Sequence, residues 1–92
     1  MPMPKHLNRV GMGVFIAEYD YFASRPQRSD AIAYLVDKGI SNNAGAAHRV
    51  SGACYLFGDP ALLREALEYI AYNSSNATAV QKKEAVGRLK GL

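Results

Sequence analysis

The sequence has no tryptophan, only three phenylalanines and a single cysteine. One cysteine, Cys54, cannot form an internal disulfide, and this usage is typical of a reducing compartment, so we expect a cytoplasmic location. Structural zinc sites take four Cys or His ligands, and the chain has one Cys and two His, so we expect no metal ion and no cofactor. The chain also lacks an apolar run of about 18 residues, which predicts no membrane contact.

A length of 92 residues corresponds to one domain, residues 1–92, with a small core. Hydrophobic residues make up 49% and charged residues 21%, which excludes collagen-like, disordered and disulfide-rich chains. Pro2 and Pro4 predict a loose N-terminal lead-in over residues 1–5. Small domains often gain stability from a partner copy, so a homodimer is one expectation.

The positive charge is concentrated at the two ends of the chain. Residues 1–29 hold four basic and two acidic residues, and residues 76–92 hold four basic and one acidic. Residues 30–75 hold three basic and five acidic residues. Basic ends attract phosphates or an acidic protein surface, but a net charge of +3 is modest for a nucleic-acid binder.

Residues 7–23 fit two patterns. Val10, Met12, Val14 and Ile16 alternate as in a strand, which would give an α+β fold with a strand or hairpin within residues 10–22. The same segment carries a helical apolar stripe, and it has few β-like partners in the chain. We therefore favour a helix over 7–23.

Local signals predict the remaining helices. Ser29 is a suitable N-cap for a helix over 29–38, which Gly39 ends in the left-handed conformation. The next helix follows Asn42, runs to Phe57 and is rich in small residues, which suggests close packing at the centre of the fold. Its expected core stripe consists of Ala47, Val50, Cys54 and Phe57.

Gly58-Asp59-Pro60 separates that helix from one over 60–72, with Asp59 as N-cap and Pro60 in the first turn. A last helix over 77–90 carries a thin apolar stripe of Val80, Ala85, Val86 and Leu89. The fold predicted from these elements is all-α, a compact bundle of four to five short helices.

One short resemblance supports this arrangement. Gly52, Tyr55, Gly58-Asp59, Ala66-Leu67 and Tyr69 resemble one helical hairpin of a tetratricopeptide repeat, with a spacing that departs by two residues. A single unit cannot bury a repeat-protein core, so the resemblance implies a helical hairpin and nothing about partners.

No constellation of residues points to catalysis. Cys54 and His48 are six residues apart on one predicted helix and do not share a face, so they cannot pair as nucleophile and base. The two carboxylate pairs, Glu18 with Asp20 and Glu65 with Glu68, are typical of solvated helix faces. Glycine-rich phosphate loops are absent. We expect a protein that is not an enzyme.

Residues 31–50 give helix, turn and helix, the order of a DNA-binding helix-turn-helix. The match is degenerate, because Leu35 and Lys38 occupy positions that usually hold a small and a buried apolar residue. The second helix would offer to base edges the side chains of Asn42, Asn43, His48 and Arg49.

The favoured function is a small protein-interaction module. Tyrosine is enriched at interfaces, and Tyr69 and Tyr72 are expected to share a binding face bordered by Arg49 or Arg64. Such a module would be a regulator or inhibitor of the phage or mobile-element type, which binds and blocks a larger protein or nucleoprotein assembly. The alternative is a small basic DNA- or RNA-binding protein that uses the degenerate helix-turn-helix or the basic side chains of its C-terminal helix, with two from the N-terminus: Lys82, Lys83, Arg88, Lys90, Lys5 and Arg9.

Overall fold

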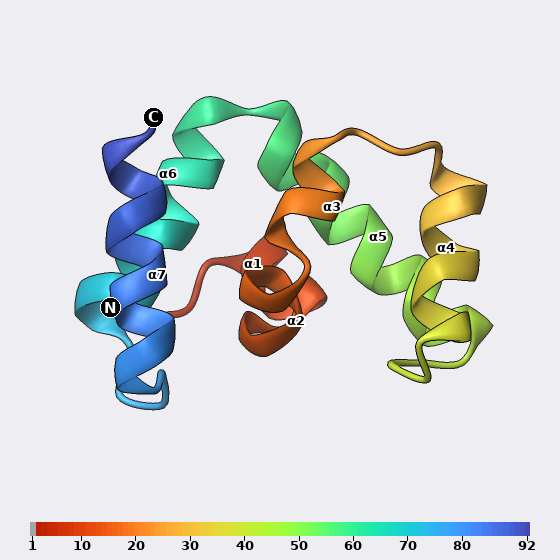
Figure 1. The fold of residues 1–92 in the computed structure, drawn as a ribbon, viewed down its shortest axis with the longest axis horizontal. Helices are drawn as coiled ribbons and strands as arrows, with labels where there is room; N and C mark the ends of the chain where they lie inside the picture. Colours follow the sequence, from red (N-terminus) through yellow and green to blue (C-terminus); the bar gives the residue numbers. More distant parts are fainter. Residues whose placement is uncertain (1) are drawn as a thin grey trace.

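A computed structural model describes residues 2–92, and every regular element among them is helical (Figure 1). Seven α-helices and one π-helical turn follow one another along the chain: α1 (Lys5–Val10), α2 (Met12–Ala17), α3 (Tyr19–Ala23), α4 (Arg28–Asp37), α5 (Asn43–Gly58), α6 (Pro60–Glu68), η1 (Tyr69–Asn73) and α7 (Ala79–Lys90). The all-α prediction is confirmed. The helices are more numerous than expected because the N-terminal segment is broken.

The N-terminal segment forms α1, α2 and α3 in place of one helix over 7–23. Gly11 has a φ of 88°, a left-handed value that glycine adopts without strain, and it separates α1 from α2. Glu18, with φ −107° and ψ 20°, separates α2 from α3. The first helix begins at Lys5, so the described part of the lead-in ends at Pro4. The alternative strand or hairpin within 10–22 is not formed.

Helix α4 ends as its sequence predicts. Gly39 has a φ of 74°, its N–H donates to the Val36 carbonyl, and the N–H of Ile40 donates to the Leu35 carbonyl. These two bonds form a Schellman motif. The helix begins at Arg28, one residue before the predicted range, and the N-cap residue is Gln27, two residues before Ser29.

Helix α5 lies at the centre of the fold and contacts α1, α3, α4 and α6. The Asn42 side chain caps it by accepting a hydrogen bond from the Gly45 N–H at 2.8 Å. A Cβ at Gly52 would lie 2.7 Å from the His6 carbonyl oxygen and 2.9 Å from the Arg9 Cβ. The predicted close packing of this small-residue helix is therefore present, and α1 is the helix that approaches.

The core stripe of α5 is rotated from the predicted one. Val50 is buried as expected, but Cys54 is exposed, and Ala47 and Phe57 are only half-buried. The residues of α5 that are buried instead are Ala46, Gly52, Ala53 and Leu56. The rotation follows from the position of α1, which covers the side of α5 that carries Gly52.

The C-terminal elements match their local signals closely. The Asp59 side chain caps α6 by accepting from the Ala61 N–H, and Pro60 follows in the first turn. The predicted helix over 60–72 changes at Tyr69 into the π-helical turn η1. Thr78 and Gln81 form a reciprocal capping box at the start of α7. Val80 is 75% exposed, so it does not belong to the core.

The buried side chains form one connected cluster. In Figure 1, α7 lies at the left end of the molecule, α4 lies at the right end, and α5 runs between them. Helices α5 and α6 are consecutive and packed together, as the hairpin resemblance implies. Within residues 2–92, no helix has the length and apolar character needed to cross a membrane.

Candidate functional site

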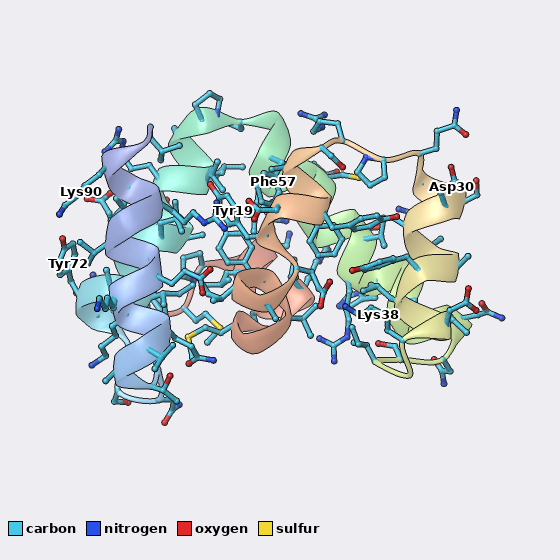
Figure 2. All side chains as sticks on the ribbon, viewed as in Figure 1. Tyr19, Asp30, Lys38, Phe57, Tyr72 and Lys90 are labelled. Atoms are coloured by element: carbon cyan, nitrogen blue, oxygen red, sulfur yellow. The ribbon has the colours of Figure 1, made fainter. Side chains whose placement is uncertain are left out.

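The expected tyrosine face of the protein-interaction hypothesis is not a single surface. Tyr69 is buried, with 9% of its surface exposed, whereas Tyr72 is 67% exposed. The π-helical turn explains the difference, because its wider i→i+5 winding directs residues three apart to more divergent sides than an α-helix does. Figure 2 shows Tyr72 and Lys90 projecting from the same end of the molecule.

The two arginines expected beside these tyrosines also separate. Arg49 donates from Nη1 to the Val10 carbonyl and from Nε to the Ser41 hydroxyl at 2.8 Å. It therefore joins α5 to the end of α1, and its side chain is half-buried. Arg64 is exposed on α6. A protein-binding role for Tyr72 and Arg64 stays a prediction.

The basic residues of α7 are partly neutralised by the fold. Arg88 lies 2.7 Å from the Asp20 carboxylate and 3.6 Å from that of Glu84, and its guanidinium stacks over the Tyr19 ring. Lys82 is half-buried, which leaves Lys83 and Lys90 as the exposed cations of this helix. The other two residues of the set, Lys5 and Arg9, lie one turn apart on α1, whose main packing partner is α5.

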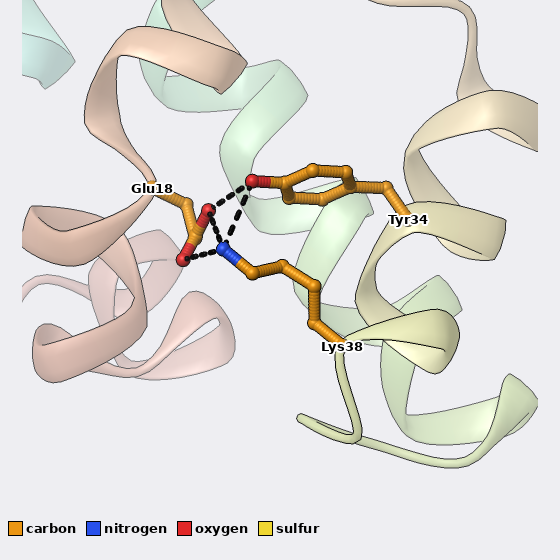
Figure 3. A network of polar contacts seen from close by, with 3 residues as sticks. All are labelled: Glu18, Tyr34 and Lys38. Carbon is orange, nitrogen blue, oxygen red and sulfur yellow. Dashed lines mark hydrogen bonds and ion pairs between the residues drawn. The ribbon is translucent and has the colours of Figure 1, made fainter.

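Glu18 is 8% exposed, which corrects the expectation of a solvated carboxylate pair with Asp20 (Figure 3). The Tyr34 hydroxyl donates to its Oε1 at 2.5 Å, and the Lys38 Nζ donates to both carboxylate oxygens at 3.1 Å. The Tyr34 hydrogen bond holds the pKa of Glu18 below its usual value, with help from Lys38 and against the effect of burial. The carboxylate, the hydroxyl and the ammonium group bind one another, so this network joins α4 to the junction of α2 and α3.

An exposed stripe on α5 lies between α1 and α4. Its residues follow the spacing i, i+4, i+7 and i+11, which keeps them within about 60° of one another around the helix axis. We call this stripe the α5 ridge, and it consists of Ala44, His48, Ser51 and Tyr55, of which Ser51 is half-buried and the other three are exposed. No Asp or Glu occurs anywhere in α5 or α1.

Cationic side chains border the α5 ridge on both sides. On the α4 side, Arg28 donates to the Ser51 hydroxyl at 2.8 Å and to the Ala47 carbonyl at 3.3 Å. Arg25 donates to the Phe57 carbonyl at 2.8 Å, at the C-terminal end of α5 and away from the ridge. On the α1 side, the Arg9 Cβ packs beside Gly52, and Lys5 lies one turn earlier. We call this border the basic rim, and its members are Lys5, Arg9 and Arg28.

The charges of the basic rim are not neutralised by ion pairs. The three ion pairs among residues 2–92 all involve Lys38 or Arg88. Arg28 donates only to carbonyl and hydroxyl oxygens, which carry no net charge. The nearby Asp30 follows Arg28 by two residues, which places it about 200° away around α4. Among residues 2–92, the basic side chains of the rim therefore have no carboxylate partner.

Tyr55 is held in place at the end of the ridge. Its ring stacks on that of His6 with centroids 4.3 Å apart and an interplanar angle of 16°. Tyr55 remains 55% exposed, so its outer face is open. The ridge thus combines an oriented aromatic ring with flanking cations.

Of these residues, sequence reasoning named Lys5, Arg9 and His48 as nucleic-acid candidates. It missed Arg28, Ser51 and Tyr55. The available signal was the absence of acidic residues from 1–17 and from 38–58, which becomes meaningful once α1 and α5 are known to pack together.

No group of three or more His, Cys, Asp or Glu side chains within residues 2–92 is arranged to hold a metal ion. Comparison of the chain with protein-family models, curated proteins and solved structures finds no match.

Proposed function

We propose that this protein binds nucleic acid through the α5 ridge and the basic rim. The observation that carries the proposal is the placement of unpaired basic side chains on two sides of α5. Lys38 and Arg88 are matched by carboxylates, whereas Lys5, Arg9 and Arg28 have none and approach α5 from α1 and α4. Lys83 and Lys90 are also unpaired, but both lie on α7 alone. Unpaired cations on two sides of an acid-free helix suit a ligand with two rows of phosphates.

This proposal shifts the alternative function from α7 to α5. It retains Lys5 and Arg9 as binding residues. It also retains the helix-turn-helix segment α4–α5, but Arg49 and Asn42 no longer contact base edges. Asn42 caps α5, and Arg49 holds α1. Of the four residues of the protein-interaction hypothesis, Tyr69 is buried and Arg49 joins α1 to α5, whereas Tyr72 and Arg64 are exposed.

The test measures the affinity of the protein for a fluorescein-labelled DNA oligonucleotide by fluorescence anisotropy. The variant Lys5→Gln/Arg9→Gln removes two charges from the basic rim. The matched control, Lys83→Gln/Lys90→Gln, removes two from α7. We expect the rim variant to weaken binding by roughly tenfold or more and the control to bind nearly as the native protein does.

Two outcomes would contradict the proposal. One is the absence of binding by the native protein at low salt. The other is a larger loss in the α7 variant than in the rim variant, which would return the binding surface to the C-terminal helix. Displacement of the DNA by an equal charge of polyglutamate would instead indicate an acidic protein as the ligand.

A further inference from the structure

We infer that α5 enters the major groove of B-form duplex DNA, so that the α5 ridge faces the base edges and the basic rim contacts the phosphates of both strands. The inference rests on the proposed nucleic-acid binding and adds the form of the nucleic acid and the mode of contact.

The first argument is the placement of charge on opposite sides of the ridge. Arg28 reaches Ser51 from α4, and the Arg9 Cβ packs beside Gly52 from α1, so two basic side chains approach α5 from opposite sides of the ridge at neighbouring residues. An α-helix with its side chains is about 10–12 Å wide, and the major groove is about 12 Å wide. Cations on both sides of a helix of this width would meet the two phosphate backbones that border the groove.

The second argument is the size of the side chains on the ridge. Ala44 and Ser51 are small, as is Ala47 beside them, so the helix backbone can approach the floor of a groove. If α5 contacted phosphates from outside the groove, small side chains on the ridge would give no advantage.

The third argument is the chemistry available for contact with bases. His48 is exposed in the first half of α5, and its imidazole carries a donor and an acceptor suited to base edges. Alanine methyl groups suit the methyl group of thymine. Tyr55, fixed by His6, lies near the far end of the ridge, where its hydroxyl can reach a phosphate.

The groove geometry distinguishes DNA from RNA. The major groove of an A-form RNA duplex is deep and too narrow for side chains on a helix to read. We therefore expect a DNA duplex to bind about tenfold or more tightly than an RNA duplex of the same sequence. A DNA duplex with bulky substituents at C5 of its pyrimidines, which fill the major groove, should also bind weakly.

The decisive variant is Ala44→Phe, which adds a bulky neutral group to the ridge without changing charge. Ala44 is exposed in the first turn of α5, immediately after the first helical residue. Ala61→Phe is the matched control, because Ala61 is exposed at the same position of α6. We expect the ridge variant to lose roughly tenfold or more in affinity for duplex DNA and the control to lose almost none. Circular dichroism verifies that both variants are folded.

The outcomes separate this inference from the proposed function. One outcome would keep nucleic-acid binding but contradict insertion of α5 into the major groove. In that outcome the DNA duplex, the RNA duplex and the single strand bind with equal affinity, and Ala44→Phe binds DNA as tightly as the native protein does. Tighter binding of the RNA duplex, or an unchanged affinity for DNA with C5 substituents, would also contradict binding in the major groove. If none of the three nucleic acids binds, both conclusions fail.

Discussion

At the scale of single residues, the fold assigns different tasks to side chains of the same type. Arg49 ties the end of α1 to α5, Arg88 forms ion pairs with Asp20 and Glu84, and Arg28 keeps its charge unpaired beside the ridge. The guanidinium groups of Arg49 and Arg28 meet only hydroxyl and carbonyl oxygens, whereas that of Arg88 meets carboxylates. Composition alone cannot make this distinction, because it depends on contacts between segments far apart in the chain.

Glu18 gives the first prediction, Glu18→Gln. In the native protein its pKa is lowered in the folded state, chiefly by the hydrogen bond from Tyr34. Its contribution to stability is therefore complete above the unfolded-state pKa of about 4.3, and it is lost as the pH falls through the lower folded-state pKa. The glutamine variant should be less stable by about 1–2 kcal/mol at pH 7, because the ion pair with Lys38 is gone, and its stability should fall less steeply below pH 4.3.

Urea unfolding at pH 7 and at a series of acidic pH values measures both effects. Glu65→Gln is the control, because Glu65 is exposed on α6 and no ion pair involves it among residues 2–92. Equal pH dependence in the native protein and Glu18→Gln would show that the network does not contribute as described.

At the scale of helices, the sequence predicts where a helix begins and ends better than it predicts which side of the helix is buried. Asn42, Asp59 and Gly39 mark helix boundaries that the structure places within a residue or two of expectation, because capping depends on contacts along a few neighbouring residues. The buried residues of α6, Leu63, Ala66 and Leu67, follow the helical spacing of its apolar side chains, which contrast with its charged ones. These are local properties.

The errors occur where distant segments decide the outcome. Helix α5 is made largely of Ala and Gly, so its apolar stripe has little contrast, and the approach of α1 determines which side is buried. The break at Gly11 likewise depends on a contact far along the chain, since a Cβ there would lie 2.6 Å from the Arg49 Nη1. For the same reason the sequence placed Cys54 in the core, whereas it is exposed.

The close contact between α1 and α5 yields a prediction for Gly52→Ala. Alanine is the better helix former by up to about 1 kcal/mol, but its Cβ would overlap backbone and side-chain atoms of α1. Overpacking of this kind costs about 1–3 kcal/mol, so we expect a net loss of stability. The comparison is Gly87→Ala in α7, where no atom lies within 4 Å of the added Cβ and a gain is expected. Urea unfolding measures the stability of both variants. If Gly52→Ala were as stable as Gly87→Ala or more stable, the close packing of α1 on α5 would be contradicted.

At the scale of the whole molecule, folding redistributes the charge that the sequence displays. Counted along the chain, the densest basic segment is residues 76–92. In the fold, Asp20 approaches Arg88 from a distant segment, while α1 and α4 bring their cations to an α5 that carries no carboxylate. A count along the sequence could therefore name Lys5 and Arg9, but it could not associate them with Arg28.

This redistribution predicts the salt dependence of binding. If the three cations of the basic rim each contact one phosphate, the logarithm of the affinity for duplex DNA should fall with the logarithm of salt concentration with a slope of about −2.7. Lys5→Gln/Arg9→Gln should make the slope shallower by about 1.8, and Lys83→Gln/Lys90→Gln should leave it unchanged. Anisotropy titrations between about 50 and 200 mM salt measure these slopes. If both double variants reduced the slope by the same amount, the phosphates would contact α7 as well as the basic rim. The presence or absence of ion pairs would then not predict which cations bind DNA.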